Sequence, residues 1–288
     1  KNLKEIYVID NIDEKILNII NLKVKKKINF INQDLSKQKI KIPKKIKIDF
    51  LIHLASITDA ASSFKNKKEV YKNNLNCFKN VLNFCKSRNV KLIHISSTSV
   101  YGSQTLYVDE TCRELFPQSP YADVKIKEER MLKKTQNKLK FISLRFGTIV
   151  GPSSGMRFHT AVNKFCMQAF TKKPLQVWRT ALHQFRPYLS IRDSFKTFNF
   201  IIKNKLFDRE TYNVVSENMT VNDIIKNINK YKKTSIKLVD ERIMNQLSYK
   251  VNSSKIKKRG LALNFKIKKD IEKTFKLLDK KNNEKKYM

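Results

Sequence analysis

The stretch DFLIHLAS at residues 49–56 is apolar almost throughout. A parallel strand covered by helices on both faces has this composition, because neither of its faces meets water. Residues 66–87 follow as a helical segment, and a second apolar run, VKLIHISS at 90–97, comes next. The helical segment carries one apolar stripe, made by Tyr71, Leu75, Phe78, Leu82 and Cys85. Strand, helix and strand in this order predict a parallel βαβ unit.

The alternation continues on both sides of this unit. Two short β-type runs precede it, EIYVID at 5–10 and INFINQDL at 28–35. A helical segment at 121–136 and the run KFISLRF at 140–146 follow it. Alternating strands and helices predict an α/β fold with a doubly wound parallel sheet. Sites on such sheets lie at the carboxyl ends of the strands, so side chains there are the first candidates for function.

The alternation loosens after GTIVGPSSG at residues 147–155. Helical patterns recur at 158–171, 192–204, 220–231 and 267–279, and short strand patterns at 187–191, 211–215 and 235–239. We therefore expect a main sheet domain over residues 1–150 and a smaller domain over 151–288. Some elements of the second domain are expected to return to the main sheet.

Composition excludes several classes of protein. Of the 288 residues 41% are hydrophobic, which favours a packed core over global disorder. No apolar run approaches the roughly 18–20 residues of a membrane span, and the first residues show no signal-peptide pattern. The four cysteines form no CxxC and no metal-binding spacing. We therefore expect a cytoplasmic protein with reduced thiols and no metal site.

The chain is strongly basic, with 61 Lys and Arg against 25 Asp and Glu and a net charge of +36. A nucleic-acid-binding protein can have such a charge. The lysines are nevertheless scattered through every segment, which favours a general bias of surface composition over a dedicated polyanion site. Both interpretations remain open at this point, and either surface would attract negatively charged substrates to a cleft.

Three polar residues could carry chemistry. Ser97 ends a predicted strand, and Tyr121 and Lys125 stand one helical turn apart at the start of a predicted helix. A tyrosine with a pKa of about 10 is a poor base at neutral pH, but a neighbouring ammonium favours its phenolate. The phenolate could then accept a proton from a sugar hydroxyl while Ser97 binds the same oxygen. YxxxK alone is a weak signal, and its alternative is a half-buried tyrosine beside a solvated lysine.

The order of the motifs strengthens the signal, because a Ser–Ser strand end, a VYG turn, a proline and YxxxK follow one another. With these motifs the chain resembles the extended short-chain dehydrogenases/reductases, in particular the NAD-dependent nucleotide-sugar epimerase/dehydratase family. The resemblance covers essentially the whole chain, and segments in both halves match segments of the family. These segments are DFLIHLAS (49–56), SSTSVYG (96–102), PYADVK (120–125), LRFGTIVGP (144–152), FRPYLSIRD (185–193) and VNSSKIKKRGL (251–261). Val124 stands where Ser or Ala is usual in the family.

The resemblance implies a Rossmann-type NAD-binding domain over 1–150 and a mainly substrate-binding domain over 151–288. Its catalytic set would be Ser97, Tyr121 and Lys125, of which Tyr121 and Lys125 would also contact NAD. The remaining cofactor contacts would come from strand ends and one helix. Asp10 would accept hydrogen bonds from the adenosine ribose, Asp34 and Leu35 would flank the adenine, Leu54, Ala55 and Ser56 would line the pyrophosphate and nicotinamide ribose, and Asn74 would lie on the cofactor side.

On the substrate side, the resemblance implies that Arg186 binds the nucleotide diphosphate, as a guanidinium suits phosphate. Trp178 falls where the family often stacks an aromatic ring on the nucleotide base, with a core tryptophan as the alternative. Thr148 falls where many members have a substrate-binding Asn. Ser97 would bind the reacting sugar hydroxyl. Three further candidates, Arg157, His159 and Asn163, stay undecided between sugar contacts and structural roles.

The chain departs from the family in two places. Members open with a strand and a GxxGxxG loop that holds the NAD pyrophosphate, whereas the earliest of the five glycines here is Gly102. We therefore expect this to be a fragment that lacks the first βα unit. Dehydratases carry Asp-Glu directly after the catalytic Ser or Thr, where this chain has Thr98 and Ser99.

The missing carboxylates resemble the pattern of 4-epimerases, in which NAD oxidises the sugar C4 hydroxyl and the hydride returns to the other face of a 4-keto sugar. A net dehydrogenase or reductase, a dehydratase of the same family, and a non-catalytic fragment remain as alternatives. The family also implies a homodimer through the helices at 66–87 and 121–136, a nucleotide-sugar substrate and no membrane. A nucleic-acid partner is not expected, despite the basic charge.

Overall fold

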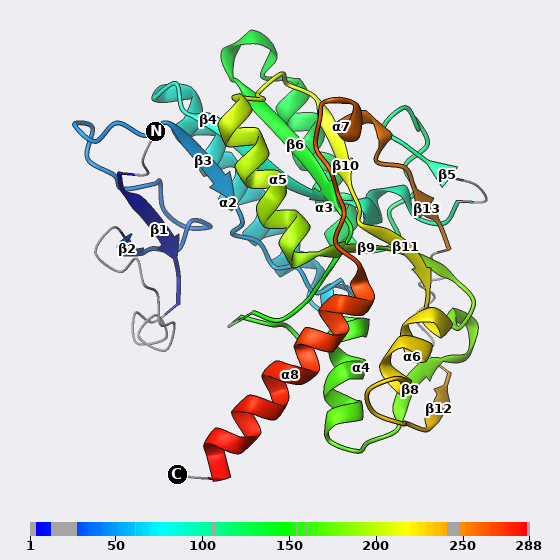
Figure 1. Cartoon of the computed structure of the whole chain (residues 1–288). Coiled ribbons are helices and arrows are strands. Elements are labelled where there is room, and N and C mark those ends of the chain that lie inside the picture. Colours follow the sequence, from blue (N-terminus) through cyan, green and yellow to red (C-terminus); the bar gives the residue numbers. More distant parts are fainter. Residues whose placement is uncertain are drawn as a thin grey trace. The chain divides into compact units, whose positions relative to one another are not determined.

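The computed structural model describes residues 4–12, 28–60, 62–104, 107–153, 155–158, 160–240 and 248–286 (Figure 1). Among these residues no helix is long and apolar enough to cross a membrane. The chain forms two compact units. Unit 1 comprises Lys1–His94 and Ser119–Phe141, and unit 2 comprises Ile95–Gln118 and Ile142–Met288. The predicted division at residue 150 into cofactor and substrate domains stays a prediction.

Unit 1 is built on short parallel strands. Strand β1 (Ile6–Asp10) pairs in parallel with β2 (Ile28–Asn32). Strand β3 (Phe50–His53) pairs in parallel with β4 (Lys91–Ser97), and the register places His53 opposite His94. All four strands lie within the runs that the sequence predicts. The β3–β4 pair, parallel and joined through a helix, is the expected βαβ arrangement.

Two helices of unit 1 lie side by side (Figure 1). Helix α2 (Lys67–Ser87) buries Phe78, Leu82 and Cys85 of its predicted apolar stripe, whereas Tyr71 and Leu75 at the start of the stripe are only half-buried. Helix α3 (Pro120–Lys133) begins where Ser119 caps it: the Ser119 side chain accepts a hydrogen bond from the backbone of Ala122. Proline at the first helical position suits such a start, because its missing N–H would have no helical partner. The helices and strands of unit 1 enclose an apolar cluster that runs from Leu35 to Phe141.

Unit 2 contains parallel strand pairs and one antiparallel pair among those described below. Strand β6 (Phe141–Phe146) pairs in parallel with β10 (Thr211–Val214). The strand order in the sheet is β10-β6-β4-β3, and β4 and β6 are each divided between the two units. A further three-stranded sheet has the order β11-β9-β7, with β9 parallel to β7 and antiparallel to β11. Its strands are β7 (Thr148–Val150), β9 (Phe185–Ser190) and β11 (Glu217–Thr220).

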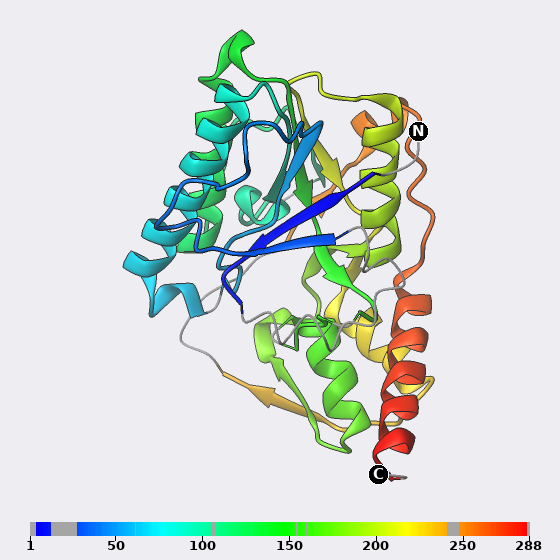
Figure 2. The same ribbon diagram turned by 90° about the vertical axis from the view of Figure 1, so that its left-hand side faces the viewer.

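The helices of unit 2 follow the predicted pattern closely. They are α4 (Ala161–Phe170), α5 (Ile191–Asn204), α6 (Val221–Asn229) and α8 (Ile267–Lys286). Helices α4 and α8 lie side by side in both views (Figures 1 and 2) and pack with α6 around a second apolar cluster. Thr220 and Asp223 form a reciprocal capping box that starts α6. The remaining short elements are β5 (Tyr107–Val108), β8 (Leu175–Trp178), β12 (Ile236–Val239), β13 (Lys250–Val251) and α7 (Ser254–Lys258).

Candidate active site

Tyr121 and Lys125 lie on one face of α3, as their spacing predicts. The ammonium nitrogen of Lys125 lies 5.8 Å from the ring centroid of Tyr121. The Lys125 side chain is almost fully buried, and Tyr121 is half-buried. The alternative of a solvated lysine beside the tyrosine is therefore wrong. A buried cation at this distance can stabilise the negative charge of a phenolate.

Lys125 has a buried counter-ion that the sequence analysis did not single out. Its Nζ donates a hydrogen bond of 2.8 Å to Oε2 of Glu128, and Nε2 of His94 lies 2.9 Å from the same oxygen. Burial opposes the charge on Lys125, but the Glu128 carboxylate outweighs it and raises the pKa of Lys125 above its ordinary value of 10.5. Burial likewise opposes the charge on Glu128, yet Lys125 and His94 hold its pKa at about 2. Both members of the pair are therefore charged at neutral pH.

Ser97 ends β4 and caps the short helical turn that follows it. Its hydroxyl oxygen accepts hydrogen bonds from the backbone N–H of Ser99 at 3.2 Å and from the Ser99 hydroxyl at 2.9 Å. These bonds use the lone pairs of the oxygen, so the proton of Ser97 remains for donation to another acceptor. The turn Thr98–Tyr101 ends at Gly102, whose φ of +68° and close approach to Phe116 exclude a side chain. Glycine in the VYG motif is thus a requirement of the turn.

The ends of β1 and β2 place two carboxylates. Asp10 is the last residue of β1 and is half-buried; its Oδ1 accepts one hydrogen bond of 3.2 Å, from the backbone of Ile12. A carboxylate has about four acceptor positions, so Asp10 can accept further bonds. Asp34 follows β2 and accepts from the backbone and hydroxyl of Ser36, which lowers its pKa. Leu35 is buried and belongs to the apolar cluster of unit 1.

The loop after β3 carries the next three candidates. Leu54 is 63% exposed at the strand end, and Ala55 and Ser56 are half-buried. Asn74, fully buried on α2, binds the loop directly: its Oδ1 accepts from the backbone N–H of Ile57 at 2.8 Å, and its Nδ2 donates to the Ile57 carbonyl at 3.0 Å. Asn74 therefore fixes the path of the loop that presents Leu54, Ala55 and Ser56.

These residues of unit 1 fit the chemistry of an NAD cofactor. Asp10 offers a carboxylate with remaining acceptor positions to a ribose diol, and a carboxylate there favours NAD over a 2′-phosphorylated dinucleotide. The exposed Leu54 beside Ala55 supplies an apolar edge at the carboxyl end of a parallel strand. Lys125 adds an ammonium whose charge is secured by Glu128. No cluster of His, Cys, Asp or Glu suited to a metal ion occurs within the described ranges.

The substrate-side candidates lie on strands of unit 2. Thr148 begins β7, half-buried and opposite Tyr188 of β9. Trp178 ends β8 and packs partly against the apolar cluster of unit 2, so the structure leaves only part of its ring for another contact. Arg186 on β9 is half-buried, and its guanidinium donates to Gln184 at 3.1 Å. Burial lowers the pKa of Arg186, because a guanidinium charge is unfavourable away from water. An anion bound to Arg186 would offset this cost of burial.

Of the three undecided residues, Arg157 and Asn163 are described by the structure. Asn163 is buried on α4, and its Nδ2 donates to the carbonyl of Arg157 at 3.0 Å. This bond ties the segment before α4 to the helix, and a sugar contact by Asn163 or Arg157 stays untested. His159 lies outside the described residues.

Sequence reasoning missed Glu128 and its two histidines. His53 and His94 occupy matching register positions on neighbouring strands, with ring centroids 6.4 Å apart and nearly parallel ring planes. The signal was present, because FLIH and KLIH place histidine at the same point of two adjacent buried strands. Paired polar residues in apolar strands indicate a shared buried partner. For His94 that partner is Glu128, three residues after Lys125 on the same helix face, whereas Nε2 of His53 is buried without a hydrogen-bond partner among the described residues.

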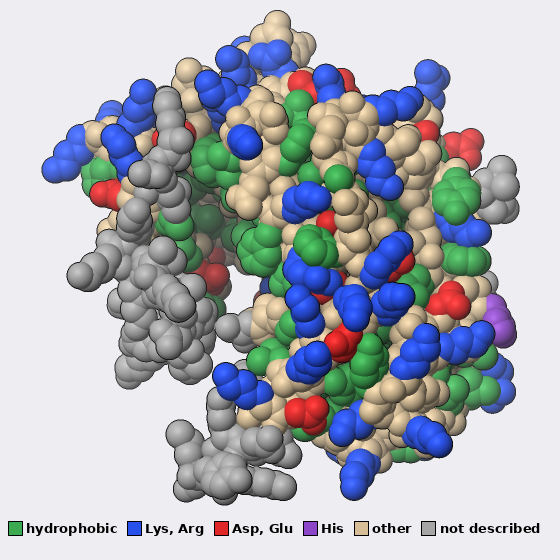
Figure 3. Space-filling model, in the orientation of Figure 1, with side chains coloured by type: hydrophobic (Ala, Val, Ile, Leu, Met, Phe, Trp, Pro, Cys, Tyr) green, Lys and Arg blue, Asp and Glu red, His purple; other side chains and the backbone are tan. Residues whose placement is uncertain are grey.

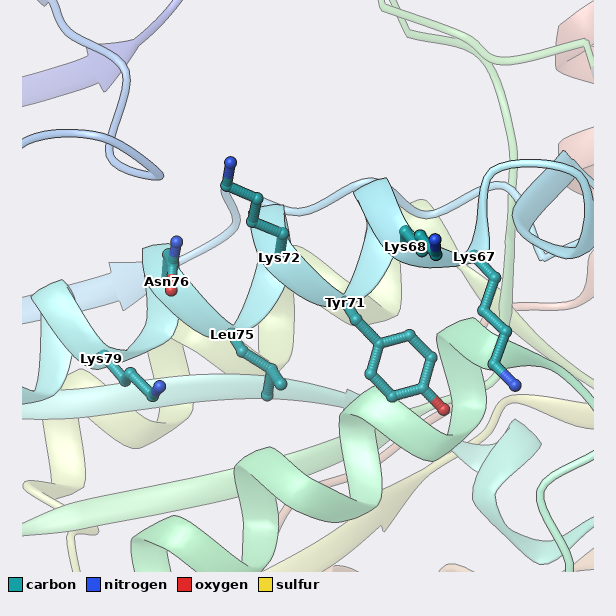
Figure 4. Close-up of a pocket in the computed structure, with 7 residues that line it drawn as sticks. All are labelled: Lys67, Lys68, Tyr71, Lys72, Leu75, Asn76 and Lys79. Carbon is teal, nitrogen blue, oxygen red and sulfur yellow. The ribbon is translucent and has the colours of Figure 1, made fainter.

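Positive charge is dispersed on the face of the molecule shown in Figure 3. Lys and Arg side chains are scattered over this face, with Asp and Glu among them. One shallow groove along α2 is lined by Lys67, Lys68, Tyr71, Lys72, Leu75, Asn76 and Lys79 (Figure 4). Tyr71 points from this groove towards α3, where its hydroxyl donates to Asp123. The predicted homodimer through α2 and α3 stays a prediction.

Comparison with known proteins shows the family. The chain is 28% identical over 225 residues to the trifunctional UDP-glucose 4,6-dehydratase/UDP-4-keto-6-deoxy-D-glucose 3,5-epimerase/UDP-4-keto-L-rhamnose-reductase of Arabidopsis thaliana, covering 74% of this chain and 33% of the relative. It is 25% identical over 210 residues to the ADP-L-glycero-D-manno-heptose-6-epimerase of Brachyspira hyodysenteriae, covering 71% of this chain and 60% of that relative. The chain thus spans between a third and two thirds of these curated relatives.

A solved structure shows the same fold. The UDP-glucuronic acid 4-epimerase from Bacillus cereus, in complex with UDP-glucuronic acid and NAD, superposes with a TM-score of 0.84 over 96% of this chain and 91% of that chain, at 24% identity. The model of the family described as "NAD dependent epimerase/dehydratase family" matches residues 7–214, which is most of the chain. With that match, the chain belongs to the NAD-dependent epimerase/dehydratase family.

Proposed function

We propose that this protein epimerises a nucleotide-activated sugar at C4, through a transient 4-keto sugar. The observation that carries the proposal is the buried, charged Lys125 beside Tyr121 on α3. The family is NAD-dependent, and its members named above act on nucleotide sugars. The solved relative with the same fold is a C4 epimerase.

Each catalytic side chain has a distinct task in this proposal. Tyr121, held as a phenolate by the Lys125 ammonium, accepts the proton of the sugar C4 hydroxyl. Ser97 donates its remaining proton to the same oxygen and orients it. NAD, when bound, would supply the acceptor for the C4 hydride and its donor when the 4-keto sugar is reduced again. When the 4-keto sugar presents its other face, Tyr121 returns the proton to the new hydroxyl oxygen.

The binding residues are proposed to contact either the cofactor or the sugar nucleotide. We propose that Asp10, Asp34, Leu35, Leu54, Ala55 and Ser56 contact the cofactor, with Asn74 acting through the loop that it fixes. Arg186 is proposed to bind the diphosphate of the sugar nucleotide, while Trp178 and Thr148 contact its nucleoside and sugar. A cytoplasmic location and a homodimer are further parts of the proposal. The dispersed positive charge supports attraction of such anionic substrates rather than a dedicated nucleic-acid site.

The absence of carboxylates next to Ser97 separates epimerisation from dehydration. Loss of water from a 4-keto sugar needs an acid and a base near C5 and C6. Here the two residues after Ser97 are Thr98, which donates to the Phe146 carbonyl, and Ser99, which donates to Ser97. Neither side chain can act as a carboxylic acid, so the 4-keto sugar is expected to be reduced again without losing water.

The test is an NMR assay of the full-length protein with UDP-, ADP- and dTDP-sugars in D2O. Epimerisation at C4 by hydride return gives the 4-epimer with hydrogen, not deuterium, at C4. A dehydratase would instead yield a 6-deoxy-4-keto sugar with deuterium introduced from solvent. Stoichiometric formation of NADH would show a net dehydrogenase. Either of these last two results would overturn the proposed reaction while leaving the family intact.

A further inference from the structure

A buried polar cluster lies behind the proposed base, between α3 and strands β3 and β4. It consists of Lys125, Glu128 and His94, and all three side chains are at most 3% exposed. We propose that Glu128, held in place by His94, is a positioning residue that keeps Lys125 protonated and aimed at Tyr121. This inference rests on the proposed function, because it concerns how the base of that reaction is maintained.

Helix geometry brings the members of this cluster together. Lys125 follows Tyr121 by four residues and precedes Glu128 by three, so all three share one face of α3. From this face Lys125 and Glu128 point into the unit, where His94 meets Glu128 from strand β4. An ionised carboxylate can only accept, so His94 donates its Nε2–H to Glu128. One oxygen of Glu128 thereby receives both bonds and is fixed from two elements.

Burial makes this support necessary. A buried lysine tends to lose its proton, because a low-dielectric environment disfavours the charged form. Neutral Lys125 could not stabilise a phenolate on Tyr121, and its side chain would lose its charge-assisted bond to Glu128. The pKa of Lys125 is nevertheless above its ordinary value, since the Glu128 carboxylate outweighs burial. The ammonium charge beside Tyr121 therefore depends on the carboxylate of Glu128, which is bonded to Lys125.

The other groups that face this cluster do not supply that anion. His53 from β3 has its pKa lowered by burial to about 3 and is neutral. Cys77 from α2 has its pKa raised by burial to about 11 and stays a thiol. Glu129 on α3 also raises the pKa of Lys125, but as a weaker contribution than Glu128. The charge of Tyr121 also raises the pKa of Lys125, again as a weaker contribution than Glu128.

The decisive variants are Glu128→Gln, which keeps the shape and removes the charge, and Glu128→Asp, which keeps the charge on a shorter stem. Glu129→Gln is the matched control, because it removes a buried carboxylate from the next residue of the same helix. Two readouts are needed. One is the pH profile of kcat and KM, and the other is the titration of the Lys125 ¹³Cε resonance by NMR in protein without substrate, assigned with Lys125→Arg.

In Glu128→Gln the Lys125 titration is expected to move down by about 1–3 pH units. The alkaline limb of kcat should move with it, while KM for the sugar nucleotide changes little. Glu128→Asp should recover part of the shift, and Glu129→Gln should give a clearly smaller one. An unchanged Lys125 titration in Glu128→Gln would overturn the proposal, as would a loss of folding stability with the same pH profile. If Glu128→Gln does not fold, Glu128→Asp decides, because an unchanged Lys125 titration there with weakened stability would mark a structural role only.

The two proposals fail in different ways. If no nucleotide sugar is converted, the proposed function fails, but the NMR titration still reports on Glu128 and Lys125. If conversion occurs and the titration of Lys125 is independent of Glu128, only the positioning role fails.

Discussion

The ammonium of Lys125 lies 5.8 Å from the ring centre of Tyr121 on one side and 2.8 Å from the carboxylate of Glu128 on the other. The lysine thus stands between the proposed base and a buried counter-ion. Lys125 pairs with Glu128 inside the fold, and in the proposed function it also stabilises the phenolate of Tyr121. These two contributions can be separated by experiment.

The first prediction concerns stability. Replacing Lys125 with Met leaves the Glu128 carboxylate buried without its cation, and we expect a loss of about 3–5 kcal/mol in the free energy of unfolding. The double variant with Glu128→Gln removes the orphaned charge and should be more stable than Lys125→Met alone. Urea unfolding at neutral pH measures both.

The control for this comparison of single and double variants is the pair formed by Lys269 and Glu272 on α8. The two residues have the same spacing of three residues and a contact of 2.9 Å. Lys269 is 59% exposed, so its pair should couple by no more than about 1 kcal/mol. Equal coupling energies for the buried and the exposed pair would contradict the structural account of Lys125.

The second prediction is a pH dependence that arises from His53. Its pKa is about 3 in the folded protein and ordinarily 6.5, because burial disfavours the imidazolium. As the pH falls below about 6.5, the unfolded chain takes up a proton that the folded protein does not, so stability should decrease. The slope of the free energy of unfolding against pH approaches about 1.4 kcal/mol per pH unit for one proton.

Urea unfolding between about pH 7 and pH 5 measures the pH dependence of stability, and the difference between wild type and His53→Gln isolates the part due to His53. Glu128 contributes stability above its ordinary pKa of 4.5 and loses it only towards its folded value of about 2, so it hardly titrates in this window. His53→Gln should flatten the slope, and the exposed His183→Gln should leave it unchanged. An identical slope in wild type and His53→Gln would show that another group is responsible.

The third prediction concerns Asn74, which binds both backbone groups of Ile57. Asn74→Leu removes two buried hydrogen bonds across 17 positions of sequence, and we expect a loss of about 1–3 kcal/mol. Dinucleotide affinity, measured by calorimetry, should fall as well, because the loop with Leu54 to Ser56 loses its anchor. Asn76→Leu, two residues along on the groove of α2 (Figure 4), should change neither quantity appreciably. Unchanged affinity in folded Asn74→Leu would remove the loop from the proposed cofactor contacts.

Much of the architecture could be predicted from residue patterns. Runs such as DFLIHLAS and KFISLRF are apolar on both faces and became β3 and β6, since a buried parallel strand permits little else. Strand β11, with the sequence ENMT, was not predicted. Its residues have no strand pattern, and it forms because antiparallel pairing with β9 satisfies its backbone, which is a tertiary effect.

The candidate site, like the fold, could be predicted from the sequence only in part. The positions of Ser97, Tyr121 and Lys125 at a strand end and on one helix face follow from sequence spacing. The burial of Glu128 does not, because the segment IKEER looks like a solvated helix face. Only the packing of α3 against strands that carry His53 and His94 turns this glutamate inward. Local pattern specifies which elements form, whereas the partners of a buried charge depend on which elements meet.

The most direct test of the central claim is the turnover of nucleotide sugars by full-length Tyr121→Phe, with Tyr71→Phe on the neighbouring helix as control. If Tyr121 is the base, the phenylalanine variant should lose about 10²–10⁴ in kcat with its fold and cofactor binding retained, because general acid–base transfer contributes that much. Tyr71→Phe should keep its turnover. Undiminished epimerisation by Tyr121→Phe would contradict the account and place the base elsewhere.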